Sequence, residues 1–136
     1  MIPCDIVLAY NKNDVCHQVF IAYDRQMLIS ADIFGIQTTT VKQLLREYEY
    51  IRVVTPVVPF TYAQRKKLSD ILYSLLDKTI TISFKERFNF VKYIFWLYEG
   101  TIHHPLFEHA SIPRTIEALL DSHLVTSTII NKSIQE

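Results

Sequence analysis

The sequence of 136 residues contains two cysteines and five histidines, the side chains best suited to act as nucleophiles and bases near neutral pH. A thiol and an imidazole are adjacent at Cys16 and His17, and the second thiol is at Cys4. A thiolate paired with an imidazole that takes and returns a proton is the machinery of nucleophilic catalysis. Neighbours on a strand point to opposite faces, so Cys16 and His17 are not expected to share a site on a strand. Both thiols are therefore expected to be small buried side chains.

A histidine-rich segment supplies the other possible ligands. His103, His104 and His109 lie close to Glu108, but no cysteine is near them and their spacing matches no zinc pattern. We therefore expect no metal here. Because the apolar residues 105–107 lie in the same loop, the segment is also a candidate for binding a partner.

The first half of the chain has the pattern of a small sheet. Apolar, β-branched runs occur at residues 5–10, 16–23, 27–31 and 50–54, with polar turn clusters after the first two. Residues 34–38 are a further candidate strand. Residues 40–46 form a short helix, for which Thr39 or Thr40 is the expected N-cap.

The second half is predicted to be helical. Thr61 and Gln64 form the capping box of a helix whose leucine and isoleucine residues recur at helical spacing. A second capping box at residues 83–86 begins a helix that is apolar around most of its circumference, and Gly100 is its expected C′ residue. Such a helix is expected to be buried against the sheet. Pro113 opens a last helix near residues 115–122, and a strand and polar tail follow from residue 125.

Six short motifs follow one another between residue 4 and about residue 99. They are Cys4-Asp5-Ile6-Val7-Leu8, His17-Gln18-Val19-Phe20-Ile21, Gly35-Ile36-Gln37-Thr38, Ile51-Arg52-Val53-Val54, Thr61-Tyr62-Ala63-Gln64-Arg65 and Phe90-Val91-Lys92-Tyr93-Ile94. In this order, they resemble the motifs of the circularly permuted papain-like hydrolases, the NlpC-related amidases and peptidases.

The resemblance implies roles for four residues. His17 matches the histidine of the family's second strand. Ser30 stands where many members keep a carboxylate that orients this histidine, and Asp32 is the nearby alternative. Arg87 stands where the family has its nucleophilic cysteine, and an arginine cannot attack a carbonyl group.

The resemblance therefore implies a degenerate member that keeps the fold and has lost the nucleophile. We expect an α+β, circularly permuted papain-like domain over residues 1–136, in which a small antiparallel sheet packs against a central buried helix and flanking helices. Residues 100–136 add a loop, a helix and a tail. The alternative is an active amidase or peptidase in which Ser83 or Cys16 reaches His17, although the helix cap already explains Ser83.

Composition narrows the function classes further. Lys and Arg total 14 and Asp and Glu total 14, a balance that argues against a nucleic-acid binder. Only two glycines occur, so no glycine-rich phosphate loop is available and no cofactor is expected. No signal peptide is apparent, and the most apolar window, residues 88–98, is too short to span a membrane.

These observations give an expected setting for the domain. A cytoplasmic protein, or a structural component of a phage particle, is expected, the phage origin following from the resemblance alone. The expected partner is another protein or a second copy of the chain. A peptide, for instance a cell-wall stem peptide, is expected to bind in the cleft that holds the active site in the family.

Overall fold

Six strands form one antiparallel sheet in the order β4-β3-β2-β1-β5-β6. The computed structural model of the chain describes residues 1–32, 34–77 and 87–132, without the side chains of residues 87–89. The strands are β1 (Ile6–Tyr10), β2 (Cys16–Ala22), β3 (Met27–Asp32), β4 (Gly35–Thr40), β5 (Tyr50–Pro56) and β6 (Val125–Asn131). The helices are α1 (Val41–Glu47), α2 (Tyr62–Leu76), α3 (Arg87–Phe95), the π-helical turn η1 (Trp96–Thr101) and α4 (Ile116–Asp121). The predicted α+β class is thus confirmed.

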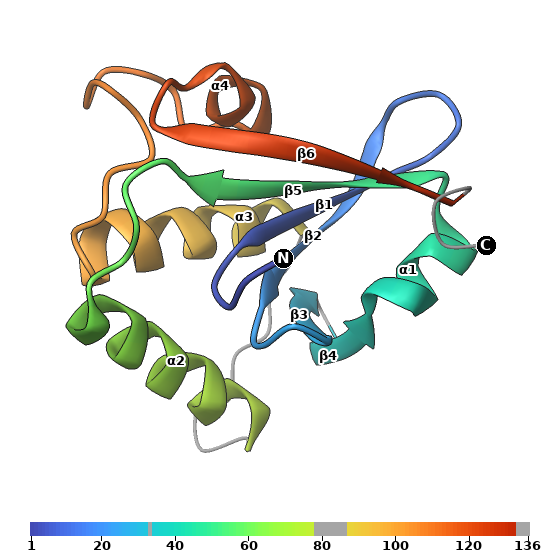
Figure 1. The fold of residues 1–136 in the computed structure, drawn as a ribbon, viewed down its shortest axis with the longest axis horizontal. Helices are drawn as coiled ribbons and strands as arrows, with labels where there is room; N and C mark the ends of the chain where they lie inside the picture. Colours follow the sequence, from blue (N-terminus) through green and yellow to red (C-terminus); the bar gives the residue numbers. More distant parts are fainter. Residues whose placement is uncertain (33, 78–86, 133–136) are drawn as a thin grey trace.

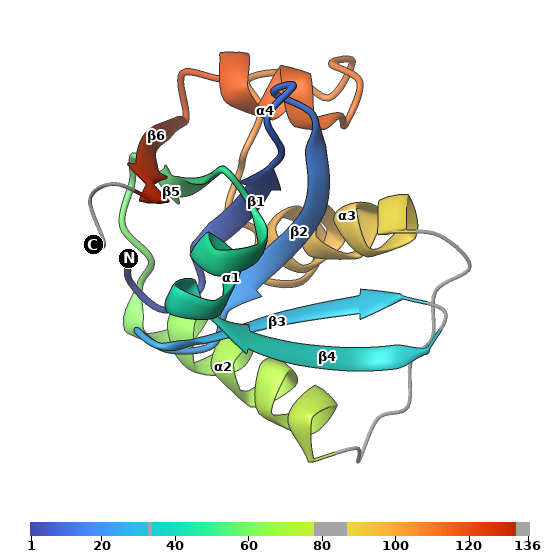
Figure 2. The same ribbon diagram turned by 90° about the vertical axis from the view of Figure 1, so that its right-hand side faces the viewer.

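Each face of the sheet has its own core. The larger core takes Ile6, Leu8 and Ile21 from the strands and packs them against residues of α2, α3, η1 and α4. The smaller core takes the alternate strand residues, such as Val7 and Phe20, and packs them against α1. Figures 1 and 2 show α1 on one side of the sheet and α3 on the other. This division follows from the period of two along each strand.

Capping explains where two of the helices begin. Thr40 accepts a hydrogen bond from the backbone N–H of Gln43 (3.1 Å) at the start of α1. Thr61 and Gln64 form the predicted capping box of α2, with both hydrogen bonds present. The prediction is confirmed at both positions, because an N-cap side chain satisfies backbone donors that the helix itself leaves unpaired.

The structure corrects the predicted end of the helix at α3. Gly100 is not the residue after the last turn, because the π-helical turn continues to Thr101 and Ile102 is its C-cap. The apolar helix was expected to be buried against the sheet, but Trp96, which follows α3, is 57% exposed. The predicted capping box at residues 83–86 lies outside the described residues. Pro113 does not begin the last helix, since Thr115 caps α4 by accepting from the N–H of Ala118.

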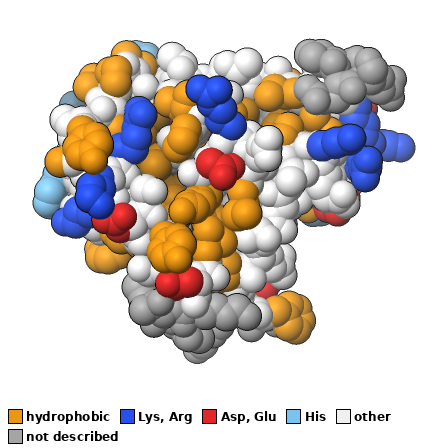
Figure 3. Space-filling view, turned by 60° about the horizontal axis from the view of Figure 1, so that its bottom comes forward, with side chains coloured by type: hydrophobic (Ala, Val, Ile, Leu, Met, Phe, Trp, Pro, Cys, Tyr) orange, Lys and Arg blue, Asp and Glu red, His pale blue; other side chains and the backbone are white. Residues whose placement is uncertain are grey.

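The described surface mixes apolar and charged side chains. In Figure 3, apolar side chains gather in the middle of the face shown, and basic and acidic groups are scattered around them. Among the described residues, no helix has both the length and the apolar character needed to cross a membrane.

Candidate functional site

A β-bulge between β1 and β2 decides where Cys16 and His17 lie. Ala9 pairs with Gln18 and Tyr10 with Cys16, so His17 is the extra residue in β2. Cys16 packs against the larger core. His17 is exposed, and its ring centroid lies 6.4 Å from that of Tyr48, which packs against the smaller core. The two neighbours are therefore associated with different faces of the sheet.

Other polar groups engage the side chains of the predicted site. His17 Nε2 lies 2.6 Å from Asn11 Nδ2. Ser30 is buried, donates its hydroxyl to the carbonyl oxygen of Val19 (2.9 Å) and accepts from Gln18 Nε2 (2.7 Å). Sequence reasoning missed Gln18, although its alternation with Val19 places it on the same side as Phe20.

Asp32 lies at the end of β3 and organises the turn to β4. Its Oδ1 accepts from the backbone N–H of Phe34 (2.8 Å), and its Oδ2 accepts from Gln37 Nε2 (2.8 Å). These are the contacts of a turn residue, which is the structural role that an Asp at this position commonly has.

The structure describes only the backbone of Arg87, the residue at the position of the family's nucleophile. Arg87 is the first residue of α3, but its side chain lies outside the described part of the structure, and so does Ser83. From residue 90 onward, α3 packs against β2 and β3 in the larger core. The helix therefore lies on the opposite side of the sheet from the contact between His17 and Tyr48.

The histidine-rich segment has structural contacts. His104 is buried, with its ring centroid 4.7 Å from that of Phe60. Glu108 accepts from the backbone N–H of His123, and hydrogen bonds to its carboxylate lower its pKa. Within the described residues, no group of three or more His, Cys, Asp or Glu side chains is arranged to hold a metal.

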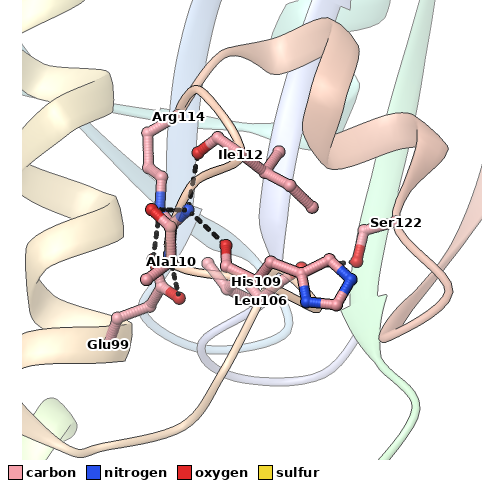
Figure 4. A network of polar contacts seen from close by, with 7 residues as sticks. All are labelled: Glu99, Leu106, His109, Ala110, Ile112, Arg114 and Ser122. Atoms are coloured by element: carbon pink, nitrogen blue, oxygen red, sulfur yellow. Dashed lines mark hydrogen bonds and ion pairs between the residues drawn. The ribbon is translucent and has the colours of Figure 1, made fainter.

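Arg114 also makes several contacts within the protein (Figure 4). Its guanidinium forms a bidentate pair with Glu99 (3.0 and 3.2 Å) and donates to the carbonyl oxygens of His109 and Ile112 (2.9 and 2.6 Å). The same group lies 4.6 Å from the ring centroid of Phe107. So many protein partners indicate that Arg114 anchors the loop before α4 to η1.

A groove of about 870 Å³ lies on the side of the sheet that carries the larger core. We call it the large groove. Its lining residues come from the β1–β2 turn, the sheet and α4: Tyr10, Asp14, Val15, Cys16, Tyr50, Arg52, Ile116, Glu117, Leu120, Ile129 and Asn131. The volume falls within the range of roughly 300–1,000 Å³ typical of ligand pockets.

An aromatic pair and a guanidinium lie together in the lining. The rings of Tyr10 and Tyr50 stack with 4.8 Å between centroids and 4° between planes. Arg52 lies 5.8 Å from the Tyr10 centroid, and its Nη1 donates to Ser127 (3.3 Å). The Tyr50 hydroxyl donates a hydrogen bond to Asp14 (2.8 Å). The pKa of Tyr50 is raised, mainly by burial and in addition by this hydrogen bond. Arg52 is the only cation among the lining residues.

From the sequence, Tyr10, Tyr50 and Arg52 were assigned only to strands. Tyr50 and Arg52 are two positions apart on β5, so they share a face, and Tyr10 pairs with Tyr50 across the strands. The alternation of aromatic and basic side chains was the available signal. Comparisons of the chain with protein-family models, curated proteins and solved structures found no match.

Proposed function

We propose that the chain is a binding domain without hydrolytic activity, and that the large groove holds a peptide segment of a partner. The observation that carries this proposal is the stacked pair Tyr10–Tyr50 beside the apolar side chains of Ile116 and Ile129. Rigid aromatic surface next to apolar walls favours peptide side chains, because it buries large area at little cost in conformational entropy.

The state of the two thiols supports the absence of catalysis. Cys4 is 1% exposed, and burial raises its pKa to about 11, so its thiolate is scarce at neutral pH. Cys16 lines the large groove and packs against the larger core, whereas His17 contacts Tyr48 beside the smaller core. A thiolate–imidazole pair requires both groups within hydrogen-bond reach of each other.

The proposal retains the resemblance to the permuted papain-like hydrolases as its evolutionary frame. α3 packs on β2 and β3 of the antiparallel sheet, whereas His17 contacts Tyr48 on the opposite side, so the proposal takes from this frame the order of the motifs and not an intact pairing of His17 with the nucleophile position. In this frame the domain is a degenerate member of the family and a virion-associated structural component. A cell-wall stem peptide is therefore the first ligand to examine, and a second copy of the chain is the other partner we propose.

Two-dimensional NMR of the whole chain tests the proposal, with a soluble cell-wall stem peptide and a set of unrelated short peptides as probes. We expect saturable shifts at residues of the large groove and an unchanged peptide mass after prolonged incubation. Ile129→Lys, which places a charge on the groove wall, is expected to weaken binding about tenfold. Tyr73→Lys on α2 is the matched control, because Tyr73 is also exposed and is not among the residues that line the groove.

Three results would count against this function. Cleavage of a probe by the purified chain would show a hydrolase. If no probe produces saturable shifts in the groove, or if Tyr73→Lys weakens binding as much as Ile129→Lys, the groove is not the peptide site.

A further inference from the structure

A second, smaller cavity lies beside α1, on the side of the sheet that carries the smaller core. It has a volume of about 350 Å³ and lies between α1 and strands β2, β3 and β4. We call it the acceptor pocket. Its polar wall is formed by Gln18, Asp32, Gln37, Gln43 and Glu47. None of its described lining residues also lines the large groove.

Hydrogen bonds within the wall arrange the three amides in the same way. The side-chain nitrogen of Gln18 donates to Ser30, that of Gln37 to Asp32 (2.8 Å) and that of Gln43 to Glu47 (3.0 Å). Each nitrogen directs one of its two N–H groups to a neighbouring oxygen, and each amide keeps its carbonyl oxygen as an acceptor. Ser30, which holds Gln18, is 1% exposed, so this part of the wall is anchored in the buried sheet.

The charge of the pocket is not balanced within its lining. Asp32 comes from the end of β3 and Glu47 from the last turn of α1, and among the described lining residues there is no Lys or Arg. A ligand that fits this wall brings hydrogen-bond donors and a positive charge. Tyr48 adds an aromatic side chain to the lining.

We propose that the acceptor pocket binds a guanidinium group, of the kind carried by an arginine side chain of a partner protein. A guanidinium is planar, offers five N–H donors and stacks on aromatic rings, whereas an ammonium presents a compact, strongly hydrated charge. Amide oxygens, two carboxylates from different elements and an aromatic side chain are the surroundings that such a planar group requires. The proposal is independent of the function assigned to the large groove.

Nα-acetyl-arginine N-methylamide is the probe, because the guanidinium is its only charge. The lysine and citrulline analogues keep the backbone and change the charged group to an ammonium and a neutral urea. We expect saturable NMR shifts around Gln18, Gln37 and Gln43 with the arginine probe, weaker binding of the lysine probe and no saturation with citrulline. Equal binding of the citrulline probe would overturn the proposal, as would shifts confined to the large groove.

Charge-neutralising variants locate the site. Asp32→Asn and Glu47→Gln are each expected to lower the affinity for the arginine probe about tenfold. Glu49→Gln is the matched control, because Glu49 is exposed close to α1 but is not among the lining residues. A loss with Glu49→Gln as large as with Glu47→Gln would show a general effect of charge and would overturn the assignment. Glu47 is exposed on α1, so Glu47→Gln is not expected to disturb the fold. This variant therefore still tests the proposal if Asp32→Asn disturbs the β3–β4 turn.

Discussion

The carboxyl group of Asp5 couples the stability of the protein to pH. Asp5 is 1% exposed and accepts from the backbone N–H of Ile2 (3.0 Å) through Oδ2. Burial is the main reason that its pKa lies above 3.8. The protonated form is thus favoured by the fold, and this contribution to stability is complete below pH 3.8 and is lost as the pH rises through the folded-state pKa.

Asp5→Asn tests this linkage by removing the titrating group. We expect the melting temperature of the variant, relative to the parent, to rise as the pH is raised from about 3 to 7. Exposed Asp24 and Glu108, whose pKa values are lowered by hydrogen bonds, act in the opposite direction, but they are common to both proteins and cancel in the difference. Parallel melting curves across this pH range would refute a special role for Asp5.

The two thiols provide an internal comparison of burial. Cys16 is half-buried at the large groove, whereas Cys4 is 1% exposed with a pKa of about 11. We expect iodoacetamide to label Cys16 in the native protein and Cys4 only after unfolding in urea, as read by mass spectrometry. Because His17 and Cys16 are associated with different faces, His17→Ala is expected to leave the rate at Cys16 unchanged. Rapid labelling of Cys16 that His17→Ala abolishes would instead reveal an activated pair and support the hydrolase alternative.

At the scale of elements, Arg114 holds the loop before α4 in place. Its replacement by lysine removes the bidentate pair with Glu99 and leaves carbonyl oxygens in the loop without their donor. We expect Arg114→Lys to lower the free energy of unfolding in urea by about 1–2 kcal/mol. The control is Lys66→Gln, which breaks an exposed pair with Asp70 and is expected to cost at most about 0.5 kcal/mol. Equal losses in the two variants would mean that Arg114 contributes no more than a surface ion pair.

Most elements were predictable because their signals are local. The capping box at Thr61 and Gln64 and the cap at Thr40 are encoded within four residues, and the structure has both. The bulge at His17 is different, because it exists only in relation to the partner strand β1. The π-helical turn was likewise not predictable, because no local sequence motif marks it as clearly as an N-cap residue marks the start of a helix. A face assignment counted along β2 alone misses the bulge, so the surroundings of His17 were not predictable.

The candidate site was predicted less well than the fold, since it depends on which strands become neighbours. Tyr10 and Tyr50 are 40 positions apart and stack only because β1 lies between β2 and β5. Gln18 and Ser30 similarly meet through the pairing of the strands. Ser30 and Asp32 were selected from the resemblance as possible partners of His17. In the structure Ser30 bonds to Gln18 and Val19, and Asp32 bonds to Phe34 and Gln37.

At the scale of the whole molecule, both edges of the sheet and the net charge favour self-association. The edge strands β4 and β6 contain no charged residue, and residues 126–129 of β6 are exposed. Charged side chains on edge strands are a common protection against pairing with another chain. The formal net charge is zero and the isoelectric point is about 7.0, so long-range repulsion between copies is weakest near neutral pH.

Thr128→Lys separates the effect of the edge from that of the charge. Thr128 is exposed on β6, where a lysine opposes pairing with a second strand, and Ser111→Lys adds the same charge to an exposed loop. In sedimentation velocity at pH 7, we expect the parent to associate as its concentration rises and Thr128→Lys to stay monomeric at concentrations where Ser111→Lys still associates. Equal suppression by both variants would assign the association to net charge alone. A parent that stays monomeric throughout would show that other features of these edges already prevent pairing, and the partner proposed for this domain would then have to be a different molecule.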